Sequence, residues 1–174
     1  ASLDEQQTAS IISAFSELES DIDYLIVDMA AGLSDSVMTF LCACQRRYIV
    51  LKNEPSSIAD AYATIKVMLQ DYNLDNIWLI PNAVTSQPDG IRLSKNINTV
   101  VKNFLGGQVN YLHSITADEM VLRATKSSKC LLDFAPSSNA TRDFKELAKI
   151  IDSQGPDIGI SGGLQFFLER IVAD

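Results

Sequence analysis

The run DYLIVDMAAGLSD occupies residues 23–35 and is the stretch that decides the fold. Four consecutive apolar residues lead into Asp28, and Gly32 follows four positions later. A short continuous apolar run predicts a strand buried on both faces, as in a parallel sheet. An acid that follows such a strand lies at the sheet edge where α/β folds bind ligands. We therefore predict a strand at residues 24–28, with Asp28 and Gly32 as candidate site residues.

Outward from this stretch, predicted strands and helices alternate along the chain. Further strands are expected at residues 48–51, 76–80 and 109–115, with Pro81 ending the second of these and a short extended piece at residues 130–134. The expected helices cover residues 4–20, 34–43, 55–69, 91–105, 118–126 and 138–152, and residues 85–90 are expected to form a polar loop. Parallel strands joined by helices form a sheet with right-handed crossovers and helices on both faces. The sequence therefore predicts an α/β fold with a mostly parallel sheet.

Composition narrows the classes of function that fit this chain. Its 174 residues carry a net charge of −8, with one histidine and three cysteines. The acidic balance argues against direct nucleic-acid binding, which needs clustered Lys and Arg. A single histidine, His113, argues against a histidine-rich metal centre or a Ser-His-Asp triad. No run of about 18 apolar residues, the length that a membrane-spanning helix needs, occurs in the sequence.

Several segments, taken in order, resemble the MinD/ParA-like ATPases. The run at residues 23–35 is similar to the family's Walker B and switch II segment, and EPSSIADAY at residues 54–62 to its next strand-to-helix junction. Asp60-Ala-Tyr followed by Ile65-Lys-Val resembles the FlhG/FleN flagellar-number regulators in particular. Asp118 with VLRA at residues 121–124 is similar to the segment beside the nucleotide base. The resemblance implies a MinD-like fold over residues 1–152.

The resemblance implies roles for four residues, each of which also has a plain structural explanation. Asp28 would hold Mg²⁺ through water, or simply cap a helix. Gly32 would let the backbone respond to a γ-phosphate, or form a turn. Asn82 would hydrogen-bond the adenine, or be a turn residue after Pro81. Asp118 would lie near the base or ribose, or serve as a helix N-cap. The implied cofactors are ATP and Mg²⁺.

The sequence contains no Gly-Lys pair, and therefore no G-x-x-x-x-G-K-[ST] loop to bind phosphates. In the family this loop lies in the N-terminal part. Two explanations remain open: the chain is a piece of a complete ATPase, or it is a natural relative without the loop. We favour the first, because the missing part is one contiguous N-terminal block. In either case we expect no catalytic residue within this chain, and weak or absent nucleotide binding by it.

The end of the chain is expected to be a linker, residues 153–163, followed by an amphipathic helix, residues 164–174. Its apolar face consists of Leu164, Phe167, Leu168, Ile171 and Val172. The resemblance implies a helix that docks reversibly on a membrane or on the protein itself. Arg170 is its only basic residue, whereas interfacial helices usually carry several. The expected location is cytoplasmic, with peripheral contact at the inner membrane.

Two hypotheses of function follow. In the first, the chain is the C-terminal part of an ATP-dependent dimerising switch that regulates flagellar number or placement. The resemblance then implies a homodimer, and as partners a signal-recognition-type flagellar GTPase, a flagellar transcription activator or a motor switch protein. In the second, the chain is a non-catalytic interaction module that keeps the fold but has lost nucleotide chemistry. The presence of a phosphate-binding loop upstream in the coding sequence would discriminate between them.

Overall fold

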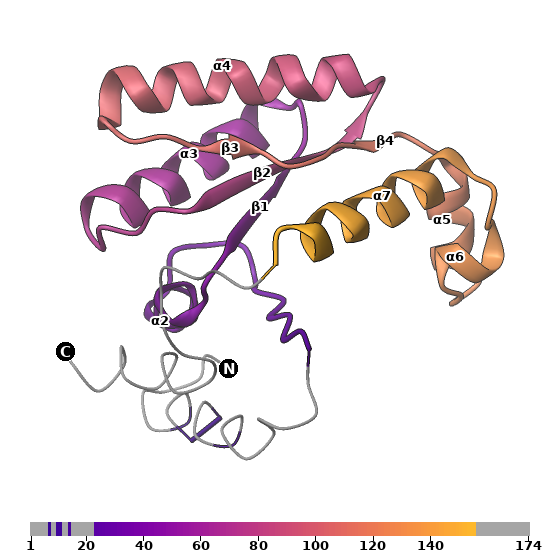
Figure 1. Cartoon of the computed structure of the whole chain (residues 1–174), viewed down its shortest axis with the longest axis horizontal. Coiled ribbons are helices and arrows are strands. Elements are labelled where there is room, and N and C mark those ends of the chain that lie inside the picture. Colours follow the sequence, from indigo (N-terminus) through magenta and orange to yellow (C-terminus); the bar gives the residue numbers. More distant parts are fainter. Residues whose placement is uncertain (1–6, 8–9, 12–13, 15–22, 156–174) are drawn as a thin grey trace. The chain divides into compact units, whose positions relative to one another are not determined.

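The computed structural model describes residues 7, 10, 11, 14 and 23–155 (Figure 1). The backbone forms two compact units, residues 1–47 with 157–174, and residues 48–156. Of the helix expected at residues 4–20, only Gln7, Ser10, Ile11 and Ala14 are described, and all four are helical. The C-terminal helix expected at residues 164–174, and residues 156–163 of the linker before it, lie outside the described residues.

The first unit contains helix α2, Asp35–Ala43, which begins one residue later than expected, with Ser34 at its N-cap position. Phe40 and Ala43 form its small core, against which Val27 and Met29 pack. Arg47 is buried and secures the end of the helix: its Nε donates to the Leu41 carbonyl at 2.8 Å, and a terminal nitrogen donates to the Cys44 carbonyl at 2.8 Å. The helix is therefore closed at its C-terminal end by a buried guanidinium rather than by glycine.

The strand predicted at residues 24–28 is wrong. These residues are irregular, and the side chain of Ile26 is 87% exposed. An apolar run becomes a strand only when neighbouring strands complete its hydrogen bonds and cover its faces. The apolar pattern of a segment indicates that its side chains prefer to be buried. It does not show whether neighbouring strands are there to bury them.

The second unit is built on a four-stranded sheet: β1 Arg47–Leu51, β2 Ile77–Val84, β3 Asn110–Tyr111 and β4 Ile115–Thr116. Strand β2 is central, with β1 on one side and β3 and β4 in turn on the other. β2 pairs in parallel with β3 (Trp78 with Asn110) and with β4 (Asn82 with Ile115). The parallel sheet is therefore confirmed.

Two strand predictions need correction. β2 continues through Pro81 to Val84, because β4 pairs with it beyond the proline, after a register shift between Asn82 and Val84. The strand expected at residues 109–115 is divided into β3 and β4. Between them the Leu112 N–H still donates to the Leu79 carbonyl at 3.0 Å. Both differences depend on how β2 pairs with residues distant in the sequence, which the pattern of a single segment does not reveal.

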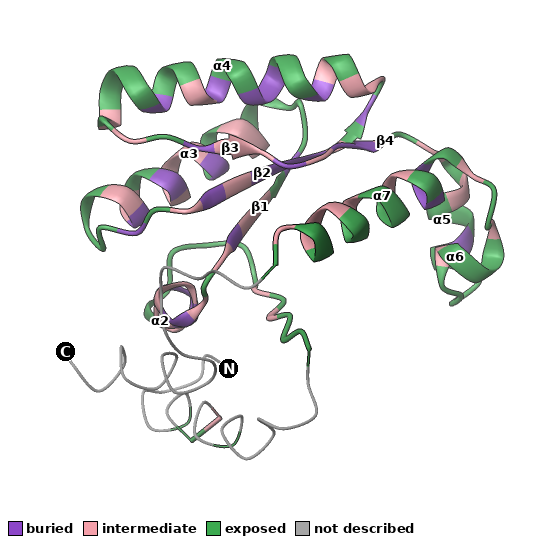
Figure 2. Cartoon of the chain, in the orientation of Figure 1, coloured by how far each residue is buried: buried purple, intermediate pink, exposed green. Residues whose placement is uncertain are grey.

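Helices cover both faces of this sheet (Figure 1). Helix α3, Pro55–Gln70, packs beside helix α4, Gln87–Leu105, on one face, and helix α7, Asn139–Ser153, covers the other. Alternation along β2 explains this: Trp78 and Ile80 pack with Leu147 and Ile150 of α7, so Ile77 and Leu79, both fully buried, point the other way. Buried residues accordingly concentrate where the helices face the strands (Figure 2).

The remaining helices agree with expectation in part. Helix α4 starts four residues earlier than expected, because Ser86 is its N-cap and Pro88 lies in its first turn, where a proline is tolerated. Gly106 ends it in the left-handed conformation, with φ of 69°, which glycine adopts without strain. Helix α5 is Glu119–Lys126, and α6, Leu131–Phe134, replaces the extended piece that was expected. Helix α3 begins after Glu54, with Pro55 as its first residue and without a side-chain cap.

Candidate functional site

Two of the four candidate residues lie together where strands β2 and β4 end. Asn82 is paired with Ile115, and Asp118 follows β4 by two residues. Ala83, next to Asn82, has φ of 54°, a left-handed conformation that non-glycine residues rarely adopt. The Asn82 side chain is half-buried and makes no hydrogen bond to any other residue that the structure describes. Its amide is therefore available to a ligand at this edge.

Asp118 is the N-cap of α5, and both of its carboxylate oxygens accept backbone hydrogen bonds. Oδ1 accepts from the Met120 N–H at 2.9 Å, and Oδ2 from the Ala140 N–H at 3.1 Å. These bonds, that of Met120 first, hold the pKa of the Asp118 carboxyl below its ordinary value. The capping role expected of this residue is thus present, and the same carboxylate also joins the start of α7. A contact with the base or ribose remains a proposal.

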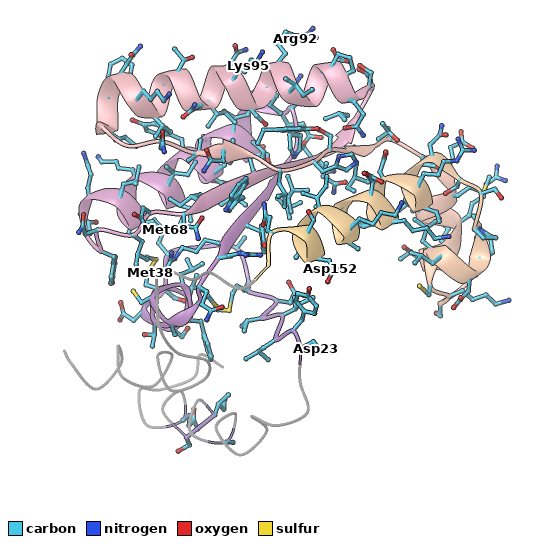
Figure 3. The ribbon with its side chains drawn as sticks, viewed as in Figure 1. Asp23, Met38, Met68, Arg92, Lys95 and Asp152 are labelled. Atoms are coloured by element: carbon cyan, nitrogen blue, oxygen red, sulfur yellow. The ribbon has the colours of Figure 1, made fainter. Side chains whose placement is uncertain are left out.

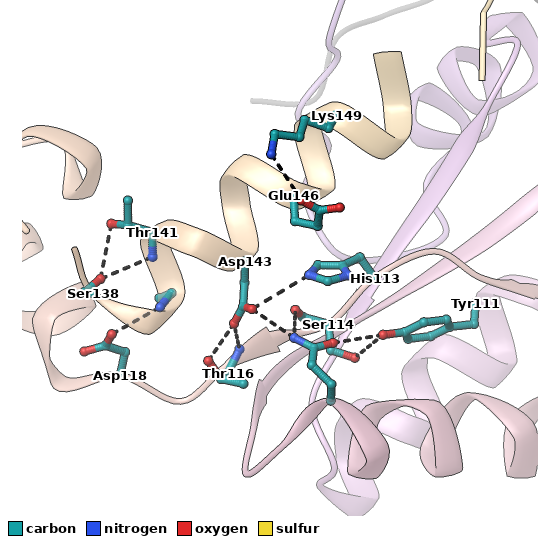
Figure 4. A network of polar contacts seen from close by, with 12 residues as sticks. Tyr111, His113, Ser114, Thr116, Asp118, Ser138, Thr141, Asp143, Glu146 and Lys149 are labelled. Carbon is teal, nitrogen blue, oxygen red and sulfur yellow. Dashed lines mark hydrogen bonds and ion pairs between the residues drawn. The ribbon is translucent and has the colours of Figure 1, made fainter. Parts of the chain in front are cut away.

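Behind this edge lies a network of polar side chains from β3, β4, α4 and α7 (Figure 4). Asp143 of α7 accepts from both the Thr116 N–H, at 2.8 Å, and the Thr116 hydroxyl, at 2.6 Å. Gln87, the first residue of α4, donates to Asp143 at 3.0 Å and to the Ser114 carbonyl at 2.9 Å. The Tyr111 hydroxyl donates to Gln87 Oε1 at 3.0 Å. The network therefore joins the ends of four elements.

The other two candidates, Asp28 and Gly32, belong to the first unit. Asp28 is exposed in the irregular segment that precedes α2. Gly32 has φ of 130°, in a region that side-chain-bearing residues rarely adopt, and no atom lies within 4 Å of a Cβ placed there. Backbone conformation, rather than crowding, therefore requires glycine at this position. Contact of either residue with phosphate or Mg²⁺ remains a proposal.

The candidate residues fit the base of a nucleotide better than its phosphates. Asn82 offers a donor and an acceptor side by side, as the edge of an adenine requires. For the phosphates, the sequence has no Gly-Lys loop. Among the described residues, no three His, Cys, Asp or Glu side chains come together as metal ligands. Mg²⁺ is commonly held by one or two carboxylates together with waters and substrate phosphates, so Asp28 alone is compatible with it.

Sequence reasoning missed Asp143 and its network. One signal was present: Ala140, Leu147 and Ile150 form the packed stripe of α7, and Asp143 lies in the same helical register. An acid within an apolar stripe indicates a buried polar contact, and the side chain of Asp143 is in fact only 15% exposed. The basic residues Arg92 and Lys95 of α4, by contrast, point away from the sheet (Figure 3).

Within the described residues, no helix is both long and apolar enough to cross a membrane.

Comparison with known proteins connects this geometry to one group. No protein-family model matches the chain. The chain is 35% identical to the antiactivator FleN of Pseudomonas aeruginosa over 170 residues, which are 98% of the chain and 61% of that protein. It is 30% identical to the flagellum site-determining protein YlxH of Helicobacter pylori over 157 residues, 88% of the chain and 53% of that protein. The chain thus spans little more than half the length of these relatives.

Solved structures agree on the fold. The septum site-determining protein MinD of Pyrococcus horikoshii, complexed with Mg-ADP, aligns with a TM-score of 0.65 at 20% identity. The alignment covers 88% of this chain and 58% of that one. At this identity the likeness concerns the fold alone. The described architecture is therefore a MinD-like α/β fold, with Asn82 and Asp118 at the carboxyl ends of its strands.

Proposed function

We propose that this chain, which belongs to the MinD/ParA-like family and within it to the FleN/FlhG type, is part of an ATP-dependent dimerising switch that regulates flagellar number and placement. The main support is its similarity to FleN along 98% of its length. The accessible amide of Asn82 beside the ends of β2 and β4 adds independent support, because ligands of parallel α/β sheets bind at that edge. The relatives are longer than this chain, so the activity proposed is that of the complete protein.

Each candidate residue has a distinct task in this proposal. Asn82 donates to and accepts from the edge of adenine, and Asp118 borders the base or ribose while it holds the starts of α5 and α7. Asp28 would hold Mg²⁺ through water, and Gly32 would let the backbone of residues 28–35 respond to the presence of the last phosphate. ATP, when bound, supplies the phosphoryl group whose loss changes the charge beside this segment. The protein contributes positioning and charge stabilisation rather than a covalent step.

In the proposed switch, the surface that binds partner proteins would differ between the two nucleotide states. We propose a homodimer in the ATP state. A signal-recognition-type flagellar GTPase, a flagellar transcription activator or a motor switch protein are the partners to test. The segment with Leu164, Phe167, Leu168, Ile171 and Val172 would dock on the protein itself or on the inner membrane. The acidic chain would act on genes only through a protein partner, since direct DNA binding needs clustered basic residues.

A genetic experiment tests the proposed function. The gene that encodes the chain is deleted in frame, and flagella per cell are counted by electron microscopy. We expect the number or position of flagella to change, and the intact gene to restore it. A gene carrying Asn82→Ala should fail to restore it at normal protein level, whereas Asn103→Ala, on the exposed surface of α4, should succeed. Unchanged flagella in the deletion strain would refute the proposal.

A second candidate function is a non-catalytic interaction module with a MinD-like fold. One observation favours it: the 174 residues contain no Gly-Lys pair to hold phosphates. Under this alternative the deletion would still alter flagella, but Asn82→Ala and Asp28→Ala would both restore them fully. The two variants therefore separate a nucleotide switch from a passive module.

A further inference from the structure

Strand β4, which leads to Asp118, has little ladder support of its own. It consists of Ile115 and Thr116 only, and its pairing with β2 passes over a register shift between Asn82 and Val84. One backbone bond beyond the strand, from the Ala117 N–H to the Val84 carbonyl at 2.8 Å, continues the contact. Such a short, irregular pairing fixes the position of the following residues weakly. The geometry of residues 115–118 must therefore depend on contacts outside the sheet.

Asp143 supplies the strongest of these contacts. Its Oδ2 accepts two hydrogen bonds from one residue, Thr116, at 2.8 Å and 2.6 Å, and its Oδ1 accepts from Gln87 Nε2 at 3.0 Å. Hydrogen bonds to an ionised carboxylate are stronger than bonds between neutral groups, and here only 15% of the side chain is exposed. His113 Nε2, 3.8 Å from Oδ1, makes no hydrogen bond within the described residues. The carboxylate is thus satisfied from β4 and from α4 together.

A second contact acts on the same short segment from the same helix. Ala140, three residues before Asp143 in α7, donates its N–H to Asp118 Oδ2 at 3.1 Å. The first turns of α7 therefore hold residues 116–118 at two points, with Asp143 on Thr116 and Ala140 on Asp118 (Figure 4). Through Gln87, the same carboxylate reaches the start of α4, which follows Asn82 and Val84 along the chain. Asp118 is consequently linked to Asp143 through the first turns of α7, and Asn82 through residues 83–87 of the backbone.

We propose that Asp143 is a positioning residue for nucleotide-base recognition, which sets the place of residues 116–118 relative to Asn82. The inference rests on the proposed function, since it assumes that the base binds at Asn82. Asp143 does not itself contact the ligand, because both of its oxygens already accept hydrogen bonds from Thr116 and Gln87. Asp143→Asn would turn an N–H donor toward the donors of Thr116 or Gln87, and the segment would lose its fixed position.

Nuclear magnetic resonance of the full 174-residue chain tests the inference with adenosine as the probe, since adenosine needs no phosphate loop. The reporters are the side-chain amide of Asn82 and the backbone amides of Thr116 and Ala117. In the wild-type chain, adenosine should shift these signals, and guanosine, which presents a different hydrogen-bonding edge, should shift them less. In Asp143→Asn, adenosine affinity should fall by about tenfold, with loss of its preference over guanosine.

Three further variants distinguish positioning from general stability. Thr116→Ser keeps both donors to Asp143 and should retain affinity and preference, whereas Thr116→Val loses the hydroxyl donor and should lower both. Ile150→Val perturbs the packed face of α7 away from the network and should leave both unchanged. Without ligand, the Thr116 amide should exchange with solvent about tenfold faster in Asp143→Asn than in Ile150→Val.

The outcomes separate the inference from the function on which it rests. If adenosine shifts the Asn82 signal equally in the wild type and in Asp143→Asn, the inference is wrong and the proposed function stands. If the wild-type chain responds to neither nucleoside, base binding at Asn82 is wrong and the inference falls with it. If Ile150→Val loses preference as Asp143→Asn does, the effect is one of stability and positioning by Asp143 is refuted.

Discussion

At the scale of single residues, Asp118 is an acid whose structural role is complete without a ligand. Its two oxygens cap α5 and hold the first turn of α7, and the Met120 bond and then the Ala140 bond lower the pKa of its carboxyl. A group whose pKa is lower in the folded protein stabilises it above its unfolded pKa, about 3.9 for Asp. This stabilisation is lost as the pH falls through the folded value.

The change Asp118→Asn should therefore alter the response to acid more than stability at neutral pH. Asparagine caps helices about as well as aspartate, so unfolding at pH 7 should change little. Below about pH 4 the wild-type chain should lose stability steeply, and the variant less steeply, because it has no carboxylate to protonate. Urea unfolding at a series of pH values measures this. If the stability of the wild type and of the variant fell equally with decreasing pH, the two backbone hydrogen bonds would not favour the ionised form of Asp118.

At Gly90 the constraint is the lack of space for a side chain. A Cβ added there would lie 2.8 Å from the Cβ of Ser114, which is fully buried. Alanine is ordinarily better than glycine inside a helix, by about 1 kcal/mol. Gly90→Ala should nevertheless destabilise the chain by about 1–3 kcal/mol, because overpacking exceeds that gain. Thermal and urea unfolding measure the difference.

Gly107→Ala is the matched control for Gly90→Ala. The atoms that a Cβ would meet there are at the flexible end of Leu69, which can move aside. Its cost should be smaller than that of Gly90→Ala. Equal costs for both variants would contradict the explanation from close approach of α4 to Ser114.

The roles of these individual residues could be predicted only in part from the sequence. Gly106 and Asp118 follow local rules for helix ends, so their positions could be predicted from neighbouring residues. The network of Asp143 could not, because its partners Gln87 and Thr116 lie 56 and 27 positions away along the chain. No local pattern specifies which distant donors a carboxylate will meet.

At the scale of elements, the segment at residues 24–28 departs most from expectation. Its side chains are apolar but exposed, with Tyr24 at 55%, Leu25 at 42% and Ile26 at 87%. Contiguous exposed apolar residues favour association with another surface. Apolar extended segments in particular can pair with other strands. The segment thus has the composition of a buried strand although its side chains are exposed.

We predict that the 174-residue chain self-associates through this segment at high concentration. Ile26→Lys should reduce the association, because a charge in the segment opposes burial in a second molecule. Light scattering over a concentration series should show the mass of the variant approaching 19.1 kDa at concentrations where the wild type exceeds it. Leu122→Lys, at an exposed position on α5, should leave the association unchanged. A wild-type chain that stays at the monomer mass throughout would refute the prediction.

The limits of several helices were predicted more accurately than those of the strands that follow β1, for a physical reason. The limits of α2, α5 and α7 agree with expectation to within one or two residues, since their caps and apolar stripes are local. Strands depend on partners: β2 extends past Pro81 because β4 pairs beyond it, and the single strand expected at residues 109–115 is divided into β3 and β4, which pair with different parts of β2. Neither fact can be read from the strand's own residues.

At the scale of the whole molecule, the candidate residues are divided between two compact units. Asp28 and Gly32 belong to one, and Asn82 and Asp118 to the other. The chain also spans 61% of FleN and 53% of YlxH. The assignment of all four residues to one nucleotide site is therefore part of the proposal.

We expect the isolated chain to bind Mg-ATP and Mg-ADP weakly, with no contribution from Asp28. The reason is that backbone N–H groups and a lysine of a phosphate-binding loop supply most contacts to the phosphates, and no Gly-Lys pair is present. Isothermal titration calorimetry should give equal heats for the wild type and Asp28→Ala. Tight binding that is lost in Asp28→Ala would mean that the strand-end site functions without a phosphate loop.

The sequence by itself indicated the resemblance to MinD/ParA-like proteins, most of the alternation of helices and strands, several helix ends and the acidic net charge. These features rest on local spacing and composition, which are written along the chain. Only the tertiary structure decided which apolar run became a strand, where β2 ends, and that Asp143 joins α7 to Thr116 and Gln87. Strand pairing and buried hydrogen bonds form between residues distant in sequence. Their outcome therefore depends on which partners the fold brings within reach.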